Sequence, residues 1–531
     1  MIKAKAEVVM RTWNPPVELS QKERFIAKRC EKRRVFVFLR ELRHRLFDDE
    51  MQAKLATMYS EVERGKGRVP PAQLALASLV QAALGVPDHE VVELTVMDKR
   101  WQMVLDCIGA DEPLFSQGTL FNFRQRVIEH GLDIDLFERT VQLARETGGF
   151  SATHLRAAFD ASPLWGAGRV EDTFNLIGRA AMHVVRTAAE RLGRPFAEIA
   201  RDAGIPVVAA TSIKTGLDLD WDDPRARKIG LEKLLGQIRT LGAWLEKEMH
   251  DGLQEPPLDE QWKLVQKLIE QDTEPDPDGG GRRVTEGVAK DRQISISDGE
   301  MRHGRKTKRK RIDGYKRHLA VDVDSPGIIC AVALTPANQP ERVAASDLFD
   351  GIARQGLHVA SLYTDRGYLG DDAIEVRRQQ GMAVHCKPFT LRNGEQFHKG
   401  HFVIDLSKGT VRCPNDIVVA ASPGNTAHFP ASQCDACPLR SQCTRARPGR
   451  GRSLSLHPHE HFHAELRQQA KSPEGRVELR RRIAVEHSLA TIHNRQGDRA
   501  RFRGLRKNLF DLRRHAALTN LSVVDQLRKA A

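Results

Sequence analysis

The sequence lacks any long apolar run and has few cysteines for its length. No stretch of about 18 uncharged apolar residues occurs among the 531 residues, and the first residues, Met1–Glu7, form no apolar signal core. We therefore expect neither a membrane span nor a secretory signal, and a cytoplasmic protein. In a reducing compartment, eight cysteines indicate free thiols or metal ligands rather than disulfides.

Acidic residues are scarce in three segments. The net charge is +13, and basic residues outnumber acidic ones by 10 to 3 over residues 21–45, by 9 to 1 over 301–317 and by 12 to 4 over 476–514. The rest of the chain is consequently acidic. Any one cluster could be a solvated face, but three together indicate a polyanionic partner, most often nucleic acid.

The first 150 residues have the patterns of helices. Pro70–Leu84 starts with a proline and ends before a glycine, and Gln117–Ile128 carries Arg124 and Arg126 beside an apolar face. A helical DNA-binding domain over residues 1–150 fits this pattern, and a plain helical bundle fits it equally well.

From residue 154 the pattern changes to a mixed α/β type. His154–Asp160 is a short apolar run that ends in an acid and precedes an Ala-Ser-Pro turn. Further strands are predicted at Tyr315–Asp322, Ile328–Leu334, Val359–Asp365 and Ala383–Cys386, with a helix carrying Ala344, Leu348 and Ile352 on one face. We expect a mixed sheet with covering helices over residues 151–391, interrupted by a helical insertion at 176–290.

Two strand-end aspartates and one glutamate are the candidate catalytic residues. Asp160 and Asp365 each end a predicted strand, and Glu486 interrupts an apolar stripe of a helix in the segment 480–493. Three carboxylates that converge would suit two Mg²⁺ ions about 3.5–4 Å apart, which catalyse phosphoryl transfer. The alternatives are that the aspartates cap turns and that Glu486 forms an ion pair with Arg482, one turn earlier.

A second candidate metal site is formed by cysteines in the segment 392–470. Cys434 and Cys437 form a Cys-x2-Cys pair, Cys443 follows and Cys413 precedes it. Four thiolates in a loop-rich segment are typical of a structural Zn²⁺ site, and free thiols are the alternative. The other cysteines, Cys30, Cys107, Cys330 and Cys386, are isolated and expected to be buried.

A basic run precedes the strand that contains Lys316. It comprises Arg302, Arg305, Lys306 and the segment Lys308–Arg311. We expect these side chains, together with Lys316, to line a cleft beside the sheet and to bind DNA phosphates without reading sequence. Recognition of a particular DNA sequence would then come from elsewhere, such as the helices within 70–150.

The chain resembles the DDE transposases of bacterial insertion sequences, in the group that includes the IS4, IS5 and IS1182 families, and is most similar to IS1182. The matching stretches run in a fixed order from about residue 110 to 525. They are Phe159–Thr173, Asp298–Lys306, Asp313–Asp322, Leu334–Asn338, Tyr363–Tyr368, Arg482 with Glu486, Arg501–Leu505, and Ala516 with Asn520 and Leu521.

The resemblance implies an RNase H-like catalytic fold in which Asp160, Asp365 and Glu486 bind two Mg²⁺ or Mn²⁺ ions. The broader group has a Tyr-x2-Arg-x3-Glu-x6-Lys signature, and this chain has Leu479 and His493 at its first and last positions. Arg482 keeps the pattern and is expected to contact DNA or orient the glutamate. The segment 471–531 would complete the catalytic domain.

The partners implied by the resemblance are double-stranded DNA, both transposon terminal inverted repeats and target DNA, and a second copy of the chain in a homodimer. Contacts to DNA are expected from His493, Arg501 and Arg503 as well as from the basic run. Two other functions remain open on the residues alone. These are a non-catalytic, zinc-containing DNA-binding regulator, and a nuclease that cuts without joining strands.

Overall fold

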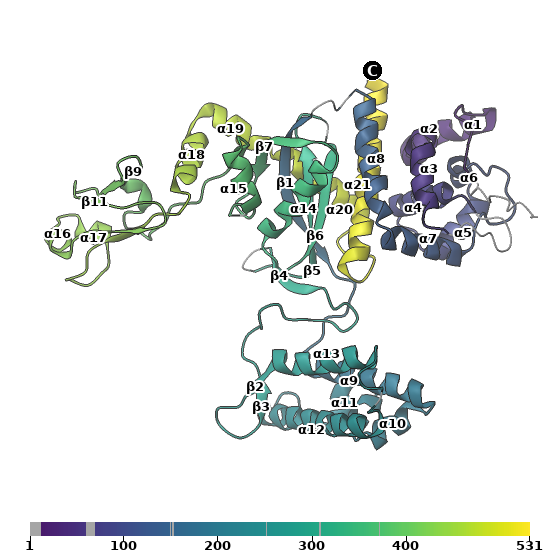
Figure 1. Cartoon of the computed structure of the whole chain (residues 1–531), viewed down its shortest axis with the longest axis horizontal. Coiled ribbons are helices and arrows are strands. Elements are labelled where there is room, and N and C mark those ends of the chain that lie inside the picture. Colours follow the sequence, from purple (N-terminus) through teal and green to yellow (C-terminus); the bar gives the residue numbers. More distant parts are fainter. Residues whose placement is uncertain are drawn as a thin grey trace, which may run out of the picture.

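The structure is a computed structural model that describes residues 12–530 apart from 60–68, 149, 151–152, 251, 307–308, 326 and 371. Lys308 of the predicted basic run thus lies outside the described residues. Figure 1 shows a central sheet with N-terminal helices on one side, a cysteine-rich arm on the other, and a helical insertion below. Within the described ranges, no helix is long and apolar enough to cross a membrane.

The central sheet is mixed, as the sequence predicts. Its strands lie in the order β6-β5-β1-β7-β8, with the short β4 beside the start of β5. The first three are antiparallel, whereas β1, β7 and β8 run parallel. The bounds are β1 His154–Trp165, β4 Arg302–Arg305, β5 Arg311–Asp322, β6 Ile329–Pro336, β7 His358–Thr364 and β8 Ala383–Cys386.

Strand β1 is longer than predicted. The expected turn after Asp160 is wrong, because the strand continues to Trp165 and pairs with β5 along this whole length. On its other side β1 pairs with β7 only as far as Ala158. Pro163 therefore occupies a part of the strand with one open edge, where the missing N–H of a proline removes no ladder hydrogen bond. Asp160 lies inside the strand rather than at its end.

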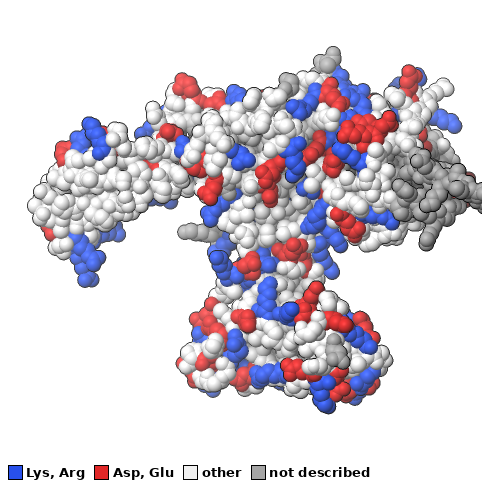
Figure 2. Space-filling view, in the orientation of Figure 1, with Lys and Arg blue, Asp and Glu red and all other residues white. Residues whose placement is uncertain are grey.

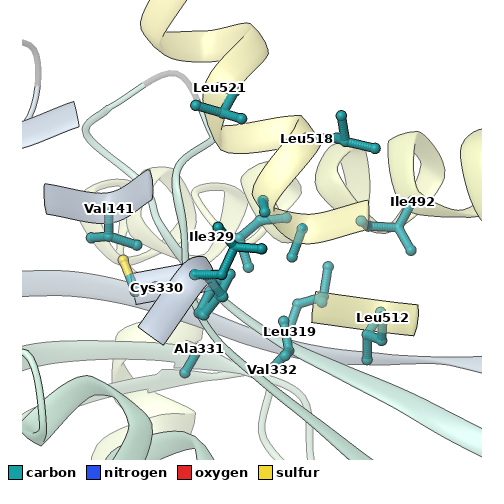
Figure 3. Close-up of a cluster of buried hydrophobic side chains, with 14 of the residues drawn as sticks. Val141, Leu319, Ile329, Cys330, Ala331, Val332, Ile492, Leu512, Leu518 and Leu521 are labelled. Atoms are coloured by element: carbon teal, nitrogen blue, oxygen red, sulfur yellow. The ribbon is translucent and has the colours of Figure 1, made fainter. Parts of the chain in front are cut away.

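The two faces of the sheet are covered by different helices. Successive strand residues point to opposite faces. The Phe159 ring packs 5.0 Å from that of Phe349 in α14 (Ala345–Ala353), whereas the side chain of Asp160 meets Arg482, which precedes α20 (Ile483–Gln496). Helices α20 and α21 (Leu505–Ala530) bury their apolar residues against β5 and β6, as Figure 3 shows for Leu319, Ile492 and Leu518. The short helix α15 (Asp372–Gln379) connects β7 to β8 along the chain.

The N-terminal helices pack around α21 and share one continuous hydrophobic core with the sheet. Their bounds are α1 Gln21–Arg29, η1 Glu31–Arg33, α2 Val35–Leu46, α3 Asp49–Ala56, α4 Pro71–Leu84, α5 Asp88–Met97, α6 Lys99–Leu105, α7 Gln117–Glu129 and α8 Leu132–Glu146. The two helices predicted from sequence are confirmed as α4 and α7. Helix α4 is buried on all sides from Pro71 to Ala82, which leaves that stretch no surface for DNA.

The helical insertion has a hydrophobic core of its own, from Phe174 to Leu268. Its elements are α9 Thr173–Leu192, α10 Phe196–Asp202, η2 Pro206–Ala209, α11 Ile213–Leu217, α12 Pro224–Glu248, α13 Leu258–Asp272, β2 Thr273–Pro275 and β3 Arg282–Val284. It departs from the sheet after β1 and returns before β4, as Figure 1 shows. The central sheet therefore folds around an interruption of more than a hundred residues.

The cysteine-rich arm has a third, much smaller core. Six apolar residues are buried in it, all in or next to short strands. Its elements are η4 Lys399–His401, β9 Val403–Asp405, β10 Thr410–Arg412, β11 Val418–Ala420, β12 Thr426–His428, α16 Ala431–Asp435, α17 Arg440–Cys443 and β13 Ser453–Ser455. Helices α18 (Glu460–Lys471) and α19 (Pro473–Arg480) lead back to the sheet.

Candidate active site

Strand register places the two aspartates side by side. Ala158 of β1 lies opposite Tyr363 of β7 in a parallel pairing. Two residues further along each segment, Asp160 therefore lies next to Asp365. The Asp160 carboxylate accepts a hydrogen bond of 2.8 Å from the Ala161 N–H, and that of Asp365 accepts one of 2.8 Å from the Gly367 N–H. Neighbouring strands are about 4.8 Å apart, so both carboxylates can reach one site.

Glu486 reaches the same site from α20, although for a different reason than the sequence predicts. The predicted continuous helix is broken at residues 481–482, between α19 and α20. The predicted apolar stripe is also wrong, because Ile483 is 53% exposed and the buried face of α20 carries Val485, Leu489 and Ile492. Glu486 lies on the open face, toward the aspartates. The glutamate therefore does not interrupt the apolar face of the helix.

Arg482 connects the glutamate to the first aspartate. Its Nη1 donates to Asp160 Oδ2 at 2.8 Å, and its Nη2 donates to Glu486 Oε1 at 2.6 Å. The ion pair with Glu486 that the sequence left as an alternative is therefore present. It does not separate Glu486 from the aspartates, because the same guanidinium holds both carboxylates.

These residues line an open cleft of about 560 Å³. Asp160, Asp365, Glu486 and Arg482 contribute to its wall. Glu341, a carboxylate that was not among the predicted site residues, lines it as well. Glu341 begins the short helix η3 (Glu341–Ala344), five residues after β6 ends. The position of this acid shortly after a strand could have indicated a site residue, but the loop between β6 and Glu341 separates it from the strand end.

The carboxylates influence one another. Burial raises the pKa of the Asp160 carboxyl above its ordinary value, and the negative charges of Asp365 and Glu486 raise it further. The Arg482 guanidinium and the Ala161 N–H act in the opposite direction. Burial and the charge of Asp365 likewise raise the pKa of Glu341. Such coupling between acids in a cleft is typical of functional sites.

The donor set suits a hard divalent cation, which prefers carboxylate oxygens. Within the described residues, however, no three or more His, Cys, Asp or Glu side chains are placed to hold a metal ion as they stand. At the cleft, Arg482 explains why the carboxylates are not arranged around a metal ion, because its guanidinium already neutralises two of them, Asp160 and Glu486. A divalent ion between Asp160 and Glu486 would have to displace it.

The residues predicted to bind DNA fall into two groups. Arg305, Lys306, Lys316 and His493 line the cleft together with Arg482. Arg302, in contrast, is held by Asp291 at 3.0 Å and by the carbonyl oxygens of Gly299 and Met301, and is absent from the cleft wall. Arg501 donates to the Val86 carbonyl of the N-terminal helices at 2.6 Å. In this structure these two arginines make structural contacts.

A second open pocket of about 720 Å³ adjoins the cleft, since Asp498 lines both. Arg503 lies in its wall with Arg169 and Arg499, and all three are exposed. The half-buried indole of Trp165, at the end of β1, contributes to the same pocket. The basic surface thus continues beyond the carboxylates.

Much of the clustered positive charge supports the fold. Arg40 and Arg43 in the first cluster are buried, and Arg40 pairs with Glu23 at 2.5 Å. Arg124 of α7 pairs with Asp88 at 2.5 Å and is nearly buried. On the face shown in Figure 2, basic and acidic residues are intermingled over the helical insertion. The buried Arg40 and Arg43 serve the fold, so the first cluster offers less free positive charge to a polyanion than its sequence suggests.

The four cysteines of the arm come together. Cys413, Cys434, Cys437 and Cys443 all line one small pocket, and the Arg452 N–H donates to Cys434 Sγ at 3.4 Å. Burial raises the pKa of the Cys443 thiol, and the other three cysteines act on it as well. Of the remaining cysteines, Cys30, Cys330 and Cys386 are buried as expected, whereas Cys107 is half-buried.

Two family models match the chain. One, described as "Transposase DDE domain", matches residues 419–524, which include Arg482 and Glu486. The other, described as "Transposase domain (DUF772)", matches residues 24–126 within the N-terminal helices. Neither match covers Asp160 or Asp365. No curated protein and no solved structure matches the chain.

The sheet with its covering helices and these two matches define an enzyme that acts on DNA, a transposase. More particularly, the two matches indicate an insertion-sequence transposase of the DDE type, and this pair of domains is typical of the IS1182 family.

Proposed function

We propose that the chain cleaves DNA at the ends of an insertion sequence and joins the freed 3′-hydroxyl to target DNA, by phosphoryl transfer that depends on two Mg²⁺ or Mn²⁺ ions. The observation that carries this proposal is the convergence of Asp160, Asp365 and Glu486 on one cleft. The wall of this cleft also carries basic side chains, namely Arg305, Lys306, Lys316 and Arg482. The strand order, three antiparallel strands followed by two parallel ones, supports an RNase H-like catalytic domain.

The chain's own residues position the reacting groups. Asp160 and Asp365 sit on adjacent strands of a rigid sheet, and α20 is fixed against the same sheet by Val485, Leu489 and Ile492. This arrangement fixes the carboxylates before DNA binds, as catalysis by positioning requires. Two bound divalent ions would activate the attacking oxygen and stabilise the leaving one.

Arg305, Lys306 and Lys316 would hold phosphates beside the carboxylates. Arg305 and Lys306 form no ion pair with a carboxylate in the part of the chain that the structure describes, and both are exposed at the rim of the cleft. Lys316 donates to the Gln339 carbonyl at 2.8 Å, which directs its ammonium group along the cleft wall. Unpaired cations of this kind attract a polyanion at little desolvation cost.

Recognition of terminal inverted repeats and synapsis of two ends by a homodimer complete the proposal. Bringing two DNA ends together needs two active sites, and closed two-fold assemblies are the commonest way to supply them. The N-terminal helices remain the proposed recognition module, through surfaces other than α4, because that helix is buried.

The test is a reaction of the purified chain with duplex DNA carrying the element's ends, a target plasmid and Mg²⁺. We expect strand cuts at the ends and joined products on a denaturing gel. Cleavage without joining would identify a nuclease instead, and tight DNA binding without any cleavage would identify a regulator. Either result overturns the proposed strand transfer.

The basic rim gives a prediction about salt. Replacing both Arg305 and Lys306 by alanine should weaken DNA binding equally for all sequences and reduce the slope of log K against log salt by about 2, since each phosphate contact contributes about 0.9. Fluorescence anisotropy between about 50 and 200 mM salt measures this slope. As a control, Lys247→Ala on α12, whose side chain is 81% exposed, should leave the slope unchanged. Equal slopes for the double variant and the wild type would remove the rim from the DNA path.

We also propose that the arm holds one structural Zn²⁺ ion on Cys413, Cys434, Cys437 and Cys443. Four thiols line one pocket, and a core of six buried residues is thin for a segment of this length. Zinc thiolate bonds are about 2.3 Å long, so the thiols would have to turn inward on binding.

The expected metal content is one zinc per chain by elemental analysis. Cys434→Ser should lose the zinc and make the arm sensitive to limited proteolysis, because structural zinc contributes folding free energy directly. Cys107→Ser, at an isolated cysteine, should keep it. Metal-free protein in which all four thiols react freely with a thiol reagent would exclude the site.

A further inference from the structure

Glu341 is a cleft carboxylate that the three predicted ligands do not account for. Its side chain is only partly exposed, and it lines the cleft with Asp160, Asp365 and Glu486. In the described part of the chain it makes no ion pair and accepts no hydrogen bond from a side chain or N–H group. A carboxylate that is half-buried without a partner needs a reason.

Glu341 lies next to Asp365. A Cβ atom placed on Gly367 would overlap Glu341 Oε2 and would lie 3.0 Å from Asp365 Oδ1, so these two oxygens are at most about 5 Å apart. A glycine at 367 is what allows the two carboxylates to approach each other. Two anions at this separation repel each other unless a proton or a cation lies between them.

The two halves of the cleft differ in their counter-ions. Arg482 neutralises Asp160 and Glu486 through contacts of 2.8 and 2.6 Å. Asp365 and Glu341 have no such arginine or lysine among the described residues. The positive charge of Lys316 influences Glu341 without a direct contact, because the Lys316 ammonium group donates to the Gln339 carbonyl. The nearby Tyr368 hydroxyl is hydrogen-bonded to His318 Nδ1 at 2.8 Å and is therefore not a partner of Glu341 either.

We propose that Glu341 is a fourth metal-binding carboxylate, and that the cleft loads its cations in order. Asp365 and Glu341 bind the first divalent cation without DNA, because no protein cation competes for them. Arg482 keeps the Asp160–Glu486 half closed until a DNA phosphate draws its guanidinium away, which opens that half to the second ion. The inference rests on the proposed metal-dependent function and deepens it.

The difference between the halves follows from electrostatics alone. A divalent ion that enters between Asp160 and Glu486 must break two charge-assisted hydrogen bonds of Arg482, whereas one that enters between Asp365 and Glu341 removes a repulsion. A DNA phosphate offers Arg482 the bidentate partner that the carboxylates otherwise provide. Loading of the second ion would thereby depend on substrate.

Binding of Mn²⁺ to the full chain without DNA tests this order. Free Mn²⁺ is followed by its electron paramagnetic resonance signal during titration. We expect one bound ion for the wild type, at least about tenfold weaker binding for Glu341→Gln, since loss of even an outer-shell partner commonly costs 10–100-fold, and a second bound ion for Arg482→Gln. Asp347→Asn, an exposed acid on the neighbouring α14, is the matched control and should bind Mn²⁺ as the wild type does.

The outcomes are distinguishable. If Glu341→Gln binds Mn²⁺ with wild-type affinity, Glu341 is not a ligand, and if Arg482→Gln gains no second ion, the ordered loading is wrong. Both results can occur while the wild type still cleaves DNA, so they leave the proposed function intact. Melting temperatures measured without metal show whether each variant is folded, and the isosteric Glu341→Gln should melt as the wild type does.

Discussion

Asparagine at Asp160 or Asp365, or glutamine at Glu486, is expected to reduce Mg²⁺-dependent cleavage of end-containing DNA by about 1000-fold or more. The reason is that metal ions supply several kcal/mol of transition-state stabilisation, and about 4 kcal/mol corresponds to a factor of about 1000. Single-turnover cleavage of a labelled duplex measures the effect. These amides keep the shape of the side chains, so DNA binding should remain.

We expect similar losses of cleavage for the three variants although the three side chains differ in solvent exposure. The side chain of Asp160 is 15% exposed and that of Glu486 is 48% exposed, yet one guanidinium holds both. Loss of the exposed half of this contact contributes little to stability. A variant at any of the three positions that cleaves at the wild-type rate would remove that residue from the catalytic set, and Asp347→Asn again serves as the control.

Asp133→Ala should lower the free energy of unfolding by about 3–5 kcal/mol, the usual cost of leaving buried charges without their partner. Asp133, in the first turn of α8, is 2% exposed and accepts from Arg506 at 2.5 Å and from Arg513 at 2.7 Å, both on α21. The substitution leaves Arg513, which is 11% exposed, without its carboxylate, whereas Arg506 is 39% exposed and still donates to the Ile128 carbonyl.

Urea unfolding followed by circular dichroism measures this loss. The matched control is Asp259→Ala, because its partner Lys263 is 73% exposed and such surface pairs contribute about 0–1 kcal/mol. Equal stabilities for the two variants would show that the α8–α21 junction does not depend on its buried charges.

The sequence predicted those parts of the fold that local chemistry decides. Helix α4 starts at a proline and ends at Gly85 in the left-handed conformation, and α7 starts at Ser116, whose hydroxyl accepts from the Thr119 N–H. The core strands were found because their apolar runs are bounded by polar residues. Asp365 was expected as the last residue of its strand, and the strand ends one residue earlier, at Thr364.

The misses have tertiary causes. The Ala-Ser-Pro segment after Asp160 has turn chemistry, and only pairing with the long β5 keeps it extended. The stripe around Glu486 was assigned to the core by its period, but the α19–α20 break turns that face toward the cleft. Glu341 was missed because a loop separates it from the end of β6, and its proximity to Asp365 depends on that loop and on Gly367. No local pattern encodes such contacts.

The most direct test of the central claim is cleavage by Asp365→Cys in Mg²⁺ and in Mn²⁺. Mg²⁺ strongly prefers oxygen ligands, whereas Mn²⁺, a transition-metal ion, accepts a thiolate more readily. If Asp365 binds a catalytic metal, the cysteine variant should be inactive in Mg²⁺ and recover cleavage in Mn²⁺, while Asp365→Ala recovers in neither. A cysteine variant whose ratio of Mn²⁺ to Mg²⁺ activity equals that of the wild type would contradict a metal-binding role for this carboxylate.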